Sequence, residues 1–94
     1  MDLREQEYVT VLAKHGNITK AAEELYVSQP TLSIFLKRLE ERMGIKLFQY
    51  IGKKMVLTQA GELYVKRAKE LLIIQNQFLG ELSDLVAGYT YNFH

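Results

Sequence analysis

Residues 28–43 have the hydrophobic pattern of one amphipathic helix. Ser28 suits its N-cap, and Gly44 suits the left-handed residue that ends many helices. Apolar residues recur every three or four positions and form one stripe, which consists of Leu32, Leu36, Leu39 and Met43. The opposite face is mostly polar and consists of Gln29, Pro30, Ser33, Ile34, Lys37 and Arg38. The pattern therefore predicts a helix that packs through one face and leaves the other free to bind a partner.

Two shorter helices are predicted before this central one. Apolar residues at helical spacing indicate a first helix over residues 3–15, and Gly16 ends it. A short second helix over residues 19–25 can take Asn17 or Thr19 as its N-cap. Only two residues separate it from the N-cap of the central helix, so the two helices must meet at a steep angle. This arrangement is a helix-turn-helix, which occurs both as a structural corner and as a DNA-binding element.

The pattern becomes extended after the central helix. Residues 46–51 and 55–58 have strand character, and Gly52, Lys53 and Lys54 separate them. These residues predict a small hairpin with a basic tip. Beside a helix-turn-helix, such a hairpin is a wing that can reach the DNA phosphates, although the same residues would also suit a plain solvated turn.

A long helix is predicted from the cap at Thr58 to about Ala87, where Gly88 ends it. At 1.5 Å per residue this helix would be roughly 45 Å long. Its apolar residues form two neighbouring stripes: Tyr64, Ala68, Leu71, Gln75, Phe78, Leu82 and Leu85 in one, and Val65, Leu72, Leu79 and Val86 in the other. Packing on its own domain needs one stripe, so the second predicts a partner helix from another chain unless both are buried internally. The expected dimer contacts are Leu71, Phe78, Leu82 and Leu85.

Residues 89–94 alternate aromatic and polar side chains, which is a strand pattern with no visible partner strand. We interpret this segment as a hinge or the first residues of a further domain that is missing here, with a tail as the alternative. The expected organisation is thus a body over residues 1–57, a linker helix over 58–87 and a last segment over 88–94.

Composition favours one folded, mainly helical domain. The 94 residues are 48% hydrophobic and include a single proline. There is no cysteine, and the two histidines, His15 and His94, are far apart, so we expect no disulfide, metal site or cofactor. No apolar run is long enough to span a membrane and no signal-peptide pattern is present, so we expect a cytoplasmic location.

The net charge of +1 is unevenly distributed along the chain. Residues 1–27 carry a formal charge of −2, residues 28–58 carry +4, and residues 59–94 carry −1. A basic middle between acidic ends favours a surface that binds a polyanion, although an ordinary solvated face has the same appearance.

Five segments together resemble the N-terminal DNA-binding domain of LysR-type transcriptional regulators. They are residues 17–25 (NITKAAEEL), 27–30 (VSQP), 37–41 (KRLEE), 44–48 (GIKLF) and 57–61 (LTQAG). The resemblance covers nearly the whole chain in order and without gaps. It implies a mainly α fold, in which a winged helix-turn-helix of three helices and a two-stranded wing is followed by a long dimerisation helix. It also implies that a small-molecule effector binds only to a larger C-terminal domain, which this chain lacks.

Carried over position by position, the resemblance places Gln29, Pro30 and Ser33 at the DNA, with Lys37, Arg38 and Lys53 near it. Three positions where the family often has arginine are instead Ile34, Tyr50 and Gly52, and Phe35 replaces a frequent glutamine. Fewer cations therefore face the DNA than is usual in the family.

We therefore expect a sequence-specific domain for double-stranded DNA that acts as a dimer on an inverted repeat. Gln29 should read a base, and the first-turn N–H groups near Thr19 and Ser28 can meet phosphates. The full set of expected DNA-binding residues is Thr19, Ser28, Gln29, Pro30, Ser33, Ile34, Lys37, Arg38, Lys53 and Lys54. The alternative is a helical protein-interaction module. An enzyme is disfavoured because no nucleophile–base pair, metal cluster or phosphate loop can be assembled from these motifs.

Overall fold

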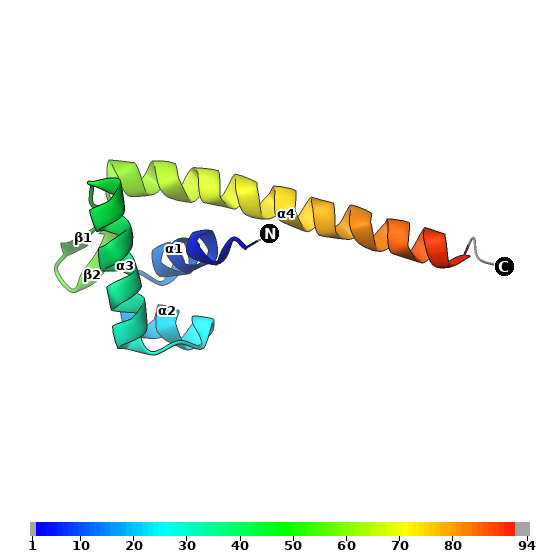
Figure 1. The fold of residues 1–94 in the computed structure, drawn as a ribbon. Helices are drawn as coiled ribbons and strands as arrows, with labels where there is room; N and C mark the ends of the chain where they lie inside the picture. The colour runs from blue at the N-terminus through cyan, green and yellow to red at the C-terminus, as the bar shows by residue number, and fades with distance from the viewer. Residues whose placement is uncertain (1, 92–94) are drawn as a thin grey trace.

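Three short helices, a hairpin and one long helix follow one another in the computed structural model, which describes residues 2–91 and side chains as far as residue 88. The helices of the N-terminal body are α1 (Arg4–His15), α2 (Ile18–Leu25) and α3 (Gln29–Met43). The strands β1 (Phe48–Ile51) and β2 (Lys54–Leu57) follow, and the chain then enters α4 (Gln59–Tyr91). Figure 1 shows α4 crossing the body and projecting far beyond it. This is the predicted winged helix-turn-helix followed by a long helix.

Local capping explains where the short helices begin and end. The Ser28 hydroxyl accepts a hydrogen bond from the N–H of Thr31 at 3.1 Å, and Gly44 ends α3 in the left-handed conformation, with φ 72°. Asn17 caps α2, so that helix begins at Ile18 and the alternative cap, Thr19, lies inside its first turn. The predicted bounds of the central helix are therefore confirmed, and those of α2 move by one residue.

The core of the body lies where α1, α2 and α3 meet the start of the wing. Its most deeply buried side chains are Val9, Leu12, Ala21, Leu32, Leu39 and Leu47. The prediction for Met43 was wrong, since this residue is 42% exposed at the last turn of α3, beyond the core. Glu40 is buried instead, and its carboxylate accepts hydrogen bonds from the N–H groups of Leu47 at 2.6 Å and Phe48 at 3.2 Å. A buried carboxylate thus joins α3 to the wing.

The hairpin is shorter than predicted and its turn is tighter. β1 and β2 pair antiparallel from Phe48 opposite Leu57 to Ile51 opposite Lys54. Only Gly52 and Lys53 form the turn, so Lys54 belongs to the second strand, and the first strand begins at residue 48 rather than 46. The N–H of Met55 donates to the carbonyl of Gly16 at 3.1 Å, which ties the hairpin to the connection between α1 and α2.

The start of α4 is fixed against the wing. The Thr58 hydroxyl accepts from the N–H of Gly61 at 3.1 Å and donates to the carbonyl of Lys46 at 2.7 Å, so the predicted cap is confirmed. Gly61 packs so closely on the main chain that a Cβ there would overlap the carbonyl oxygen of Leu47. This glycine lets α4 approach the backbone that leads into β1.

The far end of α4 differs from the prediction. The helix continues through Gly88 to Tyr91, so the predicted end at Ala87 was wrong, as was the strand pattern for residues 89–91. A glycine inside a helix costs about 1 kcal/mol relative to alanine but does not by itself end it. The remaining residues of that predicted segment, 92–94, lie outside the described residues.

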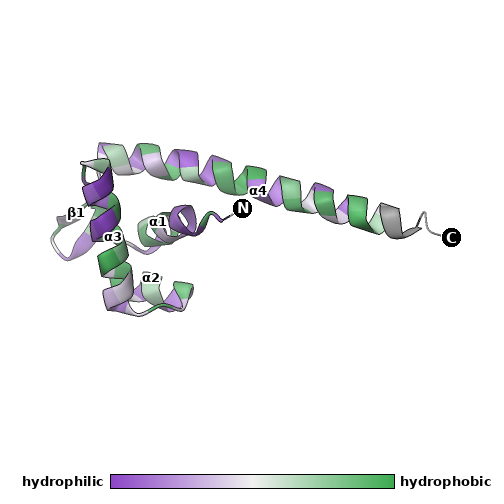
Figure 2. Cartoon of the chain, viewed as in Figure 1, coloured by the Kyte–Doolittle hydropathy of each residue, from purple (hydrophilic) through white to green (hydrophobic). Residues whose placement is uncertain are grey.

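A carboxylate on α1 joins three helices. Glu5 accepts hydrogen bonds from Arg42 of α3 at 3.0 Å and from the hydroxyl of Tyr64 on α4 at 2.8 Å. Burial and the neighbouring Glu5 carboxylate raise the pKa of the Tyr64 hydroxyl, so this side chain remains a hydrogen-bond donor. The joint holds α4 and α3 in one position relative to α1. Figure 2 shows that green, hydrophobic positions continue along α4 beyond the body.

Candidate nucleic-acid interface

The exposed face of α3 carries the side chains that the sequence pattern assigned to binding. Leu32, Leu36 and Leu39 are buried, whereas the opposite face is exposed and consists of Gln29, Pro30, Ser33, Ile34, Lys37 and Arg38. Ile34 is 50% exposed, although it is large and apolar. The predicted division of this helix into a packing face and a free face is therefore confirmed.

The amide of Gln29 is held by a side chain from the preceding helix. The Thr19 hydroxyl, in the first turn of α2, donates a hydrogen bond to Gln29 Oε1 at 3.2 Å. The oxygen keeps a second lone pair and Nε2 keeps two N–H donors. Gln29 can therefore still accept and donate side by side. Sequence reasoning assigned both residues to one surface but missed this link, because no local spacing rule joins positions ten residues apart.

Ser28 makes its side-chain hydrogen bonds within the first turn of α3. Its hydroxyl accepts from the N–H of Thr31 and donates to Thr31 Oγ1 at 2.7 Å. The proton and one lone pair of Ser28 are thus used within the helix. The Ser28 side chain therefore stabilises the first turn of α3, which carries Gln29.

The wing lies beside the free face of α3. Ser33 and Lys37 line a shallow groove of about 380 Å³ together with Phe48 and Tyr50 of β1. Lys53 is exposed at the tip, whereas the aliphatic stem of Lys54 lies against Gly16. The two lysines that the sequence placed together at the tip therefore have different surroundings.

A second groove, of about 870 Å³, lies between α1 and α3. Its floor includes Tyr8 and Phe35, whose rings form an edge-to-face pair with centroids 5.0 Å apart. Phe35, which departs from the family pattern, is thus a packing residue that joins α3 to α1. Arg4 and Arg38 line the same groove, and Arg4 is a cation beside the free face of α3 that sequence reasoning missed.

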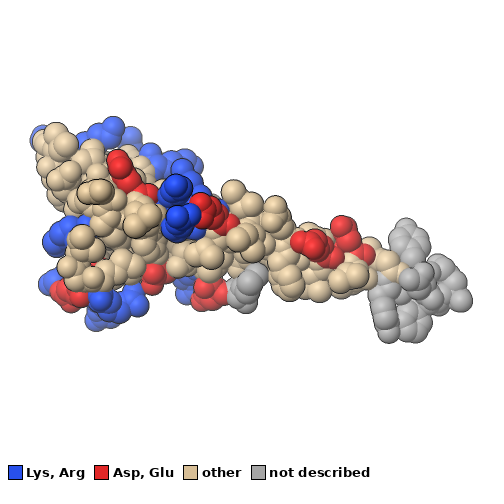
Figure 3. All heavy atoms as spheres, turned by 90° about the horizontal axis from the view of Figure 1, so that it is seen from above, with Lys and Arg blue, Asp and Glu red and all other residues tan. Residues whose placement is uncertain are grey.

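Positive charge is confined to one part of the molecule. All 12 Lys and Arg residues precede position 70, and the only charged residues after Glu70 are Glu81 and Asp84. Figure 3 shows blue side chains gathered over the body and the near part of α4, with a largely uncharged surface farther along that helix. A polyanion would therefore be attracted to the body rather than to the end of α4.

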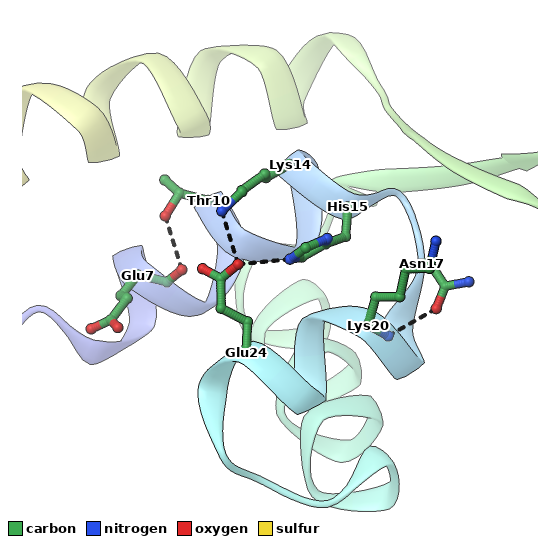
Figure 4. A network of polar contacts seen from close by, with 7 residues as sticks. All are labelled: Glu7, Thr10, Lys14, His15, Asn17, Lys20 and Glu24. Atoms are coloured by element: carbon green, nitrogen blue, oxygen red, sulfur yellow. Dashed lines mark hydrogen bonds and ion pairs between the residues drawn. The ribbon is translucent and has the colours of Figure 1, made fainter.

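A polar cluster fixes α2 against α1 and so positions the first turn that carries Thr19. Glu24 of α2 accepts from Lys14 Nζ at 2.9 Å and lies 2.8 Å from His15 Nε2, both on the last turn of α1 (Figure 4). The hydrogen bonds from Lys14 and then from His15 lower the pKa of the Glu24 carboxyl below its ordinary value. His15 therefore has a structural role here.

Residues 3–62 match the family described as "Bacterial regulatory helix-turn-helix protein, lysR family". The chain belongs to the LysR family. The matched region includes α3, both strands of the wing and Gly61 at the start of α4. The family consists of transcriptional regulators, so this LysR-family domain is not an enzyme.

Solved LysR-family domains have the same fold. The BenM DNA-binding domain in complex with its benA site 1 DNA aligns with a TM-score of 0.86 and 30% sequence identity, covering 94% of this chain and 99% of that one. The CbnR DNA-binding domain in complex with DNA aligns with a TM-score of 0.78 and 30% identity, covering 93% and 99% respectively. These matches include the long helix, so this chain is a LysR-family DNA-binding domain with its linker helix.

Curated relatives are considerably longer than this domain. The regulator BsdA of Bacillus subtilis (strain 168) is 42% identical over 95 residues, which cover 94% of this chain and 32% of that protein. The transcriptional dual regulator OxyR of Escherichia coli (strain K12) is 40% identical over 72 residues, which cover 77% and 24% respectively. The chain thus spans about a quarter to a third of the length of these relatives.

The linker helix of the LysR-family domain exposes a large apolar surface. Val65 and Ala68 are buried against the body. Farther along, eight large apolar residues are between 43% and 70% exposed: Leu71, Ile73, Ile74, Phe78, Leu79, Leu82, Leu85 and Val86. A separate apolar groove of about 340 Å³, lined by Met43, Ile45 and Leu63 among others, leads into this surface. The two stripes are therefore not both buried within the described part of the chain.

The described part of the chain, residues 2–91, holds neither a membrane-spanning helix nor a cluster of metal ligands. No helix in this part of the chain combines the length and the apolar character needed to cross a membrane. Among the same residues, no group of three or more His, Cys, Asp or Glu side chains is arranged to hold a metal ion.

Proposed function

We propose that this LysR-family domain binds one particular double-stranded DNA sequence as a two-fold dimer. The observation that carries the proposal is the exposed polar face of α3, with Gln29 in its first turn and a basic wing beside it. In this arrangement α3 enters the major groove and the wing follows the phosphate backbone. Similar LysR-family domains have been solved in complex with DNA, which supports DNA binding by this chain.

Sequence is read mainly by Gln29 in this proposal. A glutamine amide can accept from N6 of adenine and donate to its N7 at the same time. Pro30, Ser33 and Ile34 lie on the same exposed face and contact neighbouring bases or sugars.

Affinity comes mainly from phosphate contacts. Lysine and arginine side chains neutralise phosphates and release counterions, which strengthens binding to all sequences alike. The residues proposed for this role are Lys37, Arg38, Lys53 and Lys54. The first turns of α2 and α3, near Thr19 and Ser28, present backbone N–H groups that suit phosphate oxygens.

The dimer is formed by the exposed apolar surface of α4. Exposed apolar patches of this extent on a helix favour burial against another chain, and a second copy offers the same surface in a two-fold arrangement. The proposed contacts are Leu71, Phe78, Leu82 and Leu85. Two-fold symmetry then requires an inverted-repeat DNA site, with half-site centres about 34 Å apart or a multiple of that distance.

Selection of bound fragments from a random DNA pool tests the proposal directly. We expect the selected sequences to share an inverted repeat. Binding to the selected site should weaken steeply between low and moderate salt, because counterions are released. A protein-interaction module, the competing function, would select no common sequence and its contacts would depend little on salt.

The variant Gln29→Ala tests which residue reads a base. We expect it to cost about 1–3 kcal/mol on the selected site and to relax the preference at one base pair in each half-site. Gln77→Ala, which removes an exposed glutamine on α4, serves as the control. Equal losses of Gln29→Ala on selected and random DNA would refute the base-reading role.

Regulation of transcription in the whole protein needs more than this domain. Because the curated relatives are about three times as long as this chain, we propose that a further domain binds a small-molecule effector and controls the DNA-bound dimer. We place the body at residues 1–57, the dimerisation helix from residue 58 and the hinge after it. Because the relatives named above are bacterial transcriptional regulators, we propose that the protein acts in the cytoplasm.

A further inference from the structure

The hydrogen bond between Thr19 and Gln29 joins the first turns of two helices on the exposed surface. Thr19 Oγ1 lies 3.2 Å from Gln29 Oε1, and both side chains are exposed. Both backbones are fixed nearby, since Asn17 caps α2 with an N–H···O distance of 3.0 Å to Lys20 and Ser28 caps α3. The donor and acceptor are therefore presented by two rigid helix starts.

A carboxamide has two faces for hydrogen bonding, and a rotation by 180° exchanges them. Without a neighbour, Gln29 could present its oxygen and its NH₂ group to DNA in either order. In the structure the Thr19 hydroxyl donates to the amide oxygen, and after such a rotation the same hydroxyl would accept from the NH₂ group. In either order the hydrogen bond restrains where the amide lies, and in the observed order Nε2 keeps both of its N–H bonds.

We infer that Thr19 is a positioning residue that holds the Gln29 amide in place and so sharpens its choice of base pair, an inference that rests on the proposed function. An acceptor and a donor held side by side match N6 and N7 of adenine, whereas the same edge of guanine offers two acceptors, O6 and N7. An amide held in place therefore discriminates between adenine and guanine more sharply than one that can shift to make a single hydrogen bond to guanine. Thr19 acts through Gln29 and makes no base contact of its own.

This role differs measurably from a phosphate contact at the same position. A hydroxyl bound to phosphate would strengthen binding to every sequence, independently of the side chain at position 29. A hydroxyl that orients Gln29 has an effect only on the matched base pair, and only while Gln29 is present. The two roles therefore make different predictions for a double-mutant cycle.

The experiment compares Thr19→Val, Thr19→Ser and Gln29→Ala, and combines the first with the third. Valine keeps the shape and β-branching of threonine without the hydroxyl, and serine restores the hydroxyl. Binding is measured by fluorescence anisotropy on the selected inverted repeat, on the same DNA with guanine at the adenine read by Gln29, and on random DNA. Melting temperatures verify folding, and Thr19→Ala provides a second hydroxyl-free variant if valine prevents folding.

We expect Thr19→Val to bind the selected site about three- to tenfold more weakly, the value of one hydrogen bond, with little change on random DNA. Discrimination against guanine should fall by the same factor, and Thr19→Ser should retain most of it. In the Gln29→Ala background, removal of the hydroxyl should have no further effect.

Three results would overturn the inference. One is an equal loss on all three DNAs that persists in the Gln29→Ala background, which would identify a phosphate contact. Another is unchanged discrimination in Thr19→Val. A wild-type domain that selects no common sequence would refute the proposed function itself, and with it any positioning role for Thr19.

Discussion

Ile34 is a large apolar side chain exposed on an otherwise polar helix face. On DNA, apolar contact of this kind is available from the methyl group of thymine or from a sugar. Replacing the thymines nearest Ile34 with uracil removes the methyl groups and should weaken binding by ~0.8 kcal/mol for each methyl that the side chain covers. Titration of the two DNAs under identical salt conditions measures this difference.

The matched variant for this prediction is Ile34→Ala, which should bind the thymine and uracil sites with equal affinity. If wild-type affinity is the same at every uracil-substituted site, Ile34 does not contact a thymine methyl. In that case its exposed surface serves a sugar or a protein contact.

Gly61 and Gly80 both lie within α4 but have opposite surroundings. A Cβ at Gly61 would overlap the main chain at Leu47, whereas a Cβ at Gly80 would meet nothing within 4 Å. We expect Gly61→Ala to lower the free energy of unfolding by about 1–3 kcal/mol, because neither backbone can move away without loss of packing. Gly80→Ala should raise helix stability by about 0.5–1 kcal/mol. Urea unfolding of both variants measures the contrast, and equal effects would mean that α4 can shift away from the wing.

Among the elements, the wing is the one where a mutation should most clearly change the affinity for DNA without changing the preference for particular bases. Lys53 is exposed at its turn, so Lys53→Ala should weaken binding to all sequences alike and reduce the slope of log affinity against log salt by about one unit per half-site. Lys69→Ala, which removes an exposed lysine on α4, is the control. A changed base preference with an unchanged slope would show that the tip of the wing reads bases.

Element boundaries set by local chemistry could be predicted from the sequence. The caps at Ser28, Gly44 and Thr58 act on groups within four residues, so their side chains specify the helix ends directly. Gly88 misled the prediction because glycine ends a helix only where the chain leaves it in the left-handed conformation. At Gly88 the backbone instead remains helical.

Contacts between elements could not be predicted in the same way. Glu40 is buried where the sequence pattern had placed Met43 in the core. Its burial depends on the N–H groups of Leu47 and Phe48, which reach the carboxylate only after the chain has turned at Gly44. The link from Thr19 to Gln29 likewise depends on the angle between α2 and α3. Sequence periodicity places such residues on a face but does not determine which of them touch.

At the scale of the whole molecule, the apolar surface of α4 determines the assembly that we propose. Phe78 is 49% exposed in the single chain. It is one of the proposed dimer contacts, which together form the seam between the two chains: Leu71, Phe78, Leu82 and Leu85. Phe78→Asp would place a charge in a buried apolar contact, which should dissociate the dimer and remove most of the affinity for the inverted repeat. Analytical ultracentrifugation measures the dissociation, and circular dichroism shows whether the body remains folded.

The control for this experiment is Gln77→Asp, which adds the same charge to the neighbouring position outside the predicted stripes. It should leave the dimer intact. A Phe78→Asp protein that sediments as an unchanged dimer would mean that α4 pairs through another surface, and the predicted half-site spacing would then have no basis.

The contacts between the body and the near part of α4 allow the two to turn together. Val65 and Ala68 are buried against the body, and Glu5 accepts hydrogen bonds from both Arg42 of α3 and Tyr64 of α4, so we expect the body to follow α4 when the angle between the two α4 helices of the dimer changes. From Phe78, in the middle of the proposed dimer contacts, to Gln59 at the start of α4 is about 28 Å, so a rotation of about 7° moves α3 by about 3.4 Å. One base-pair step is roughly 3.4 Å. A few degrees at the seam are therefore enough to shift one recognition helix by a whole base pair relative to the other.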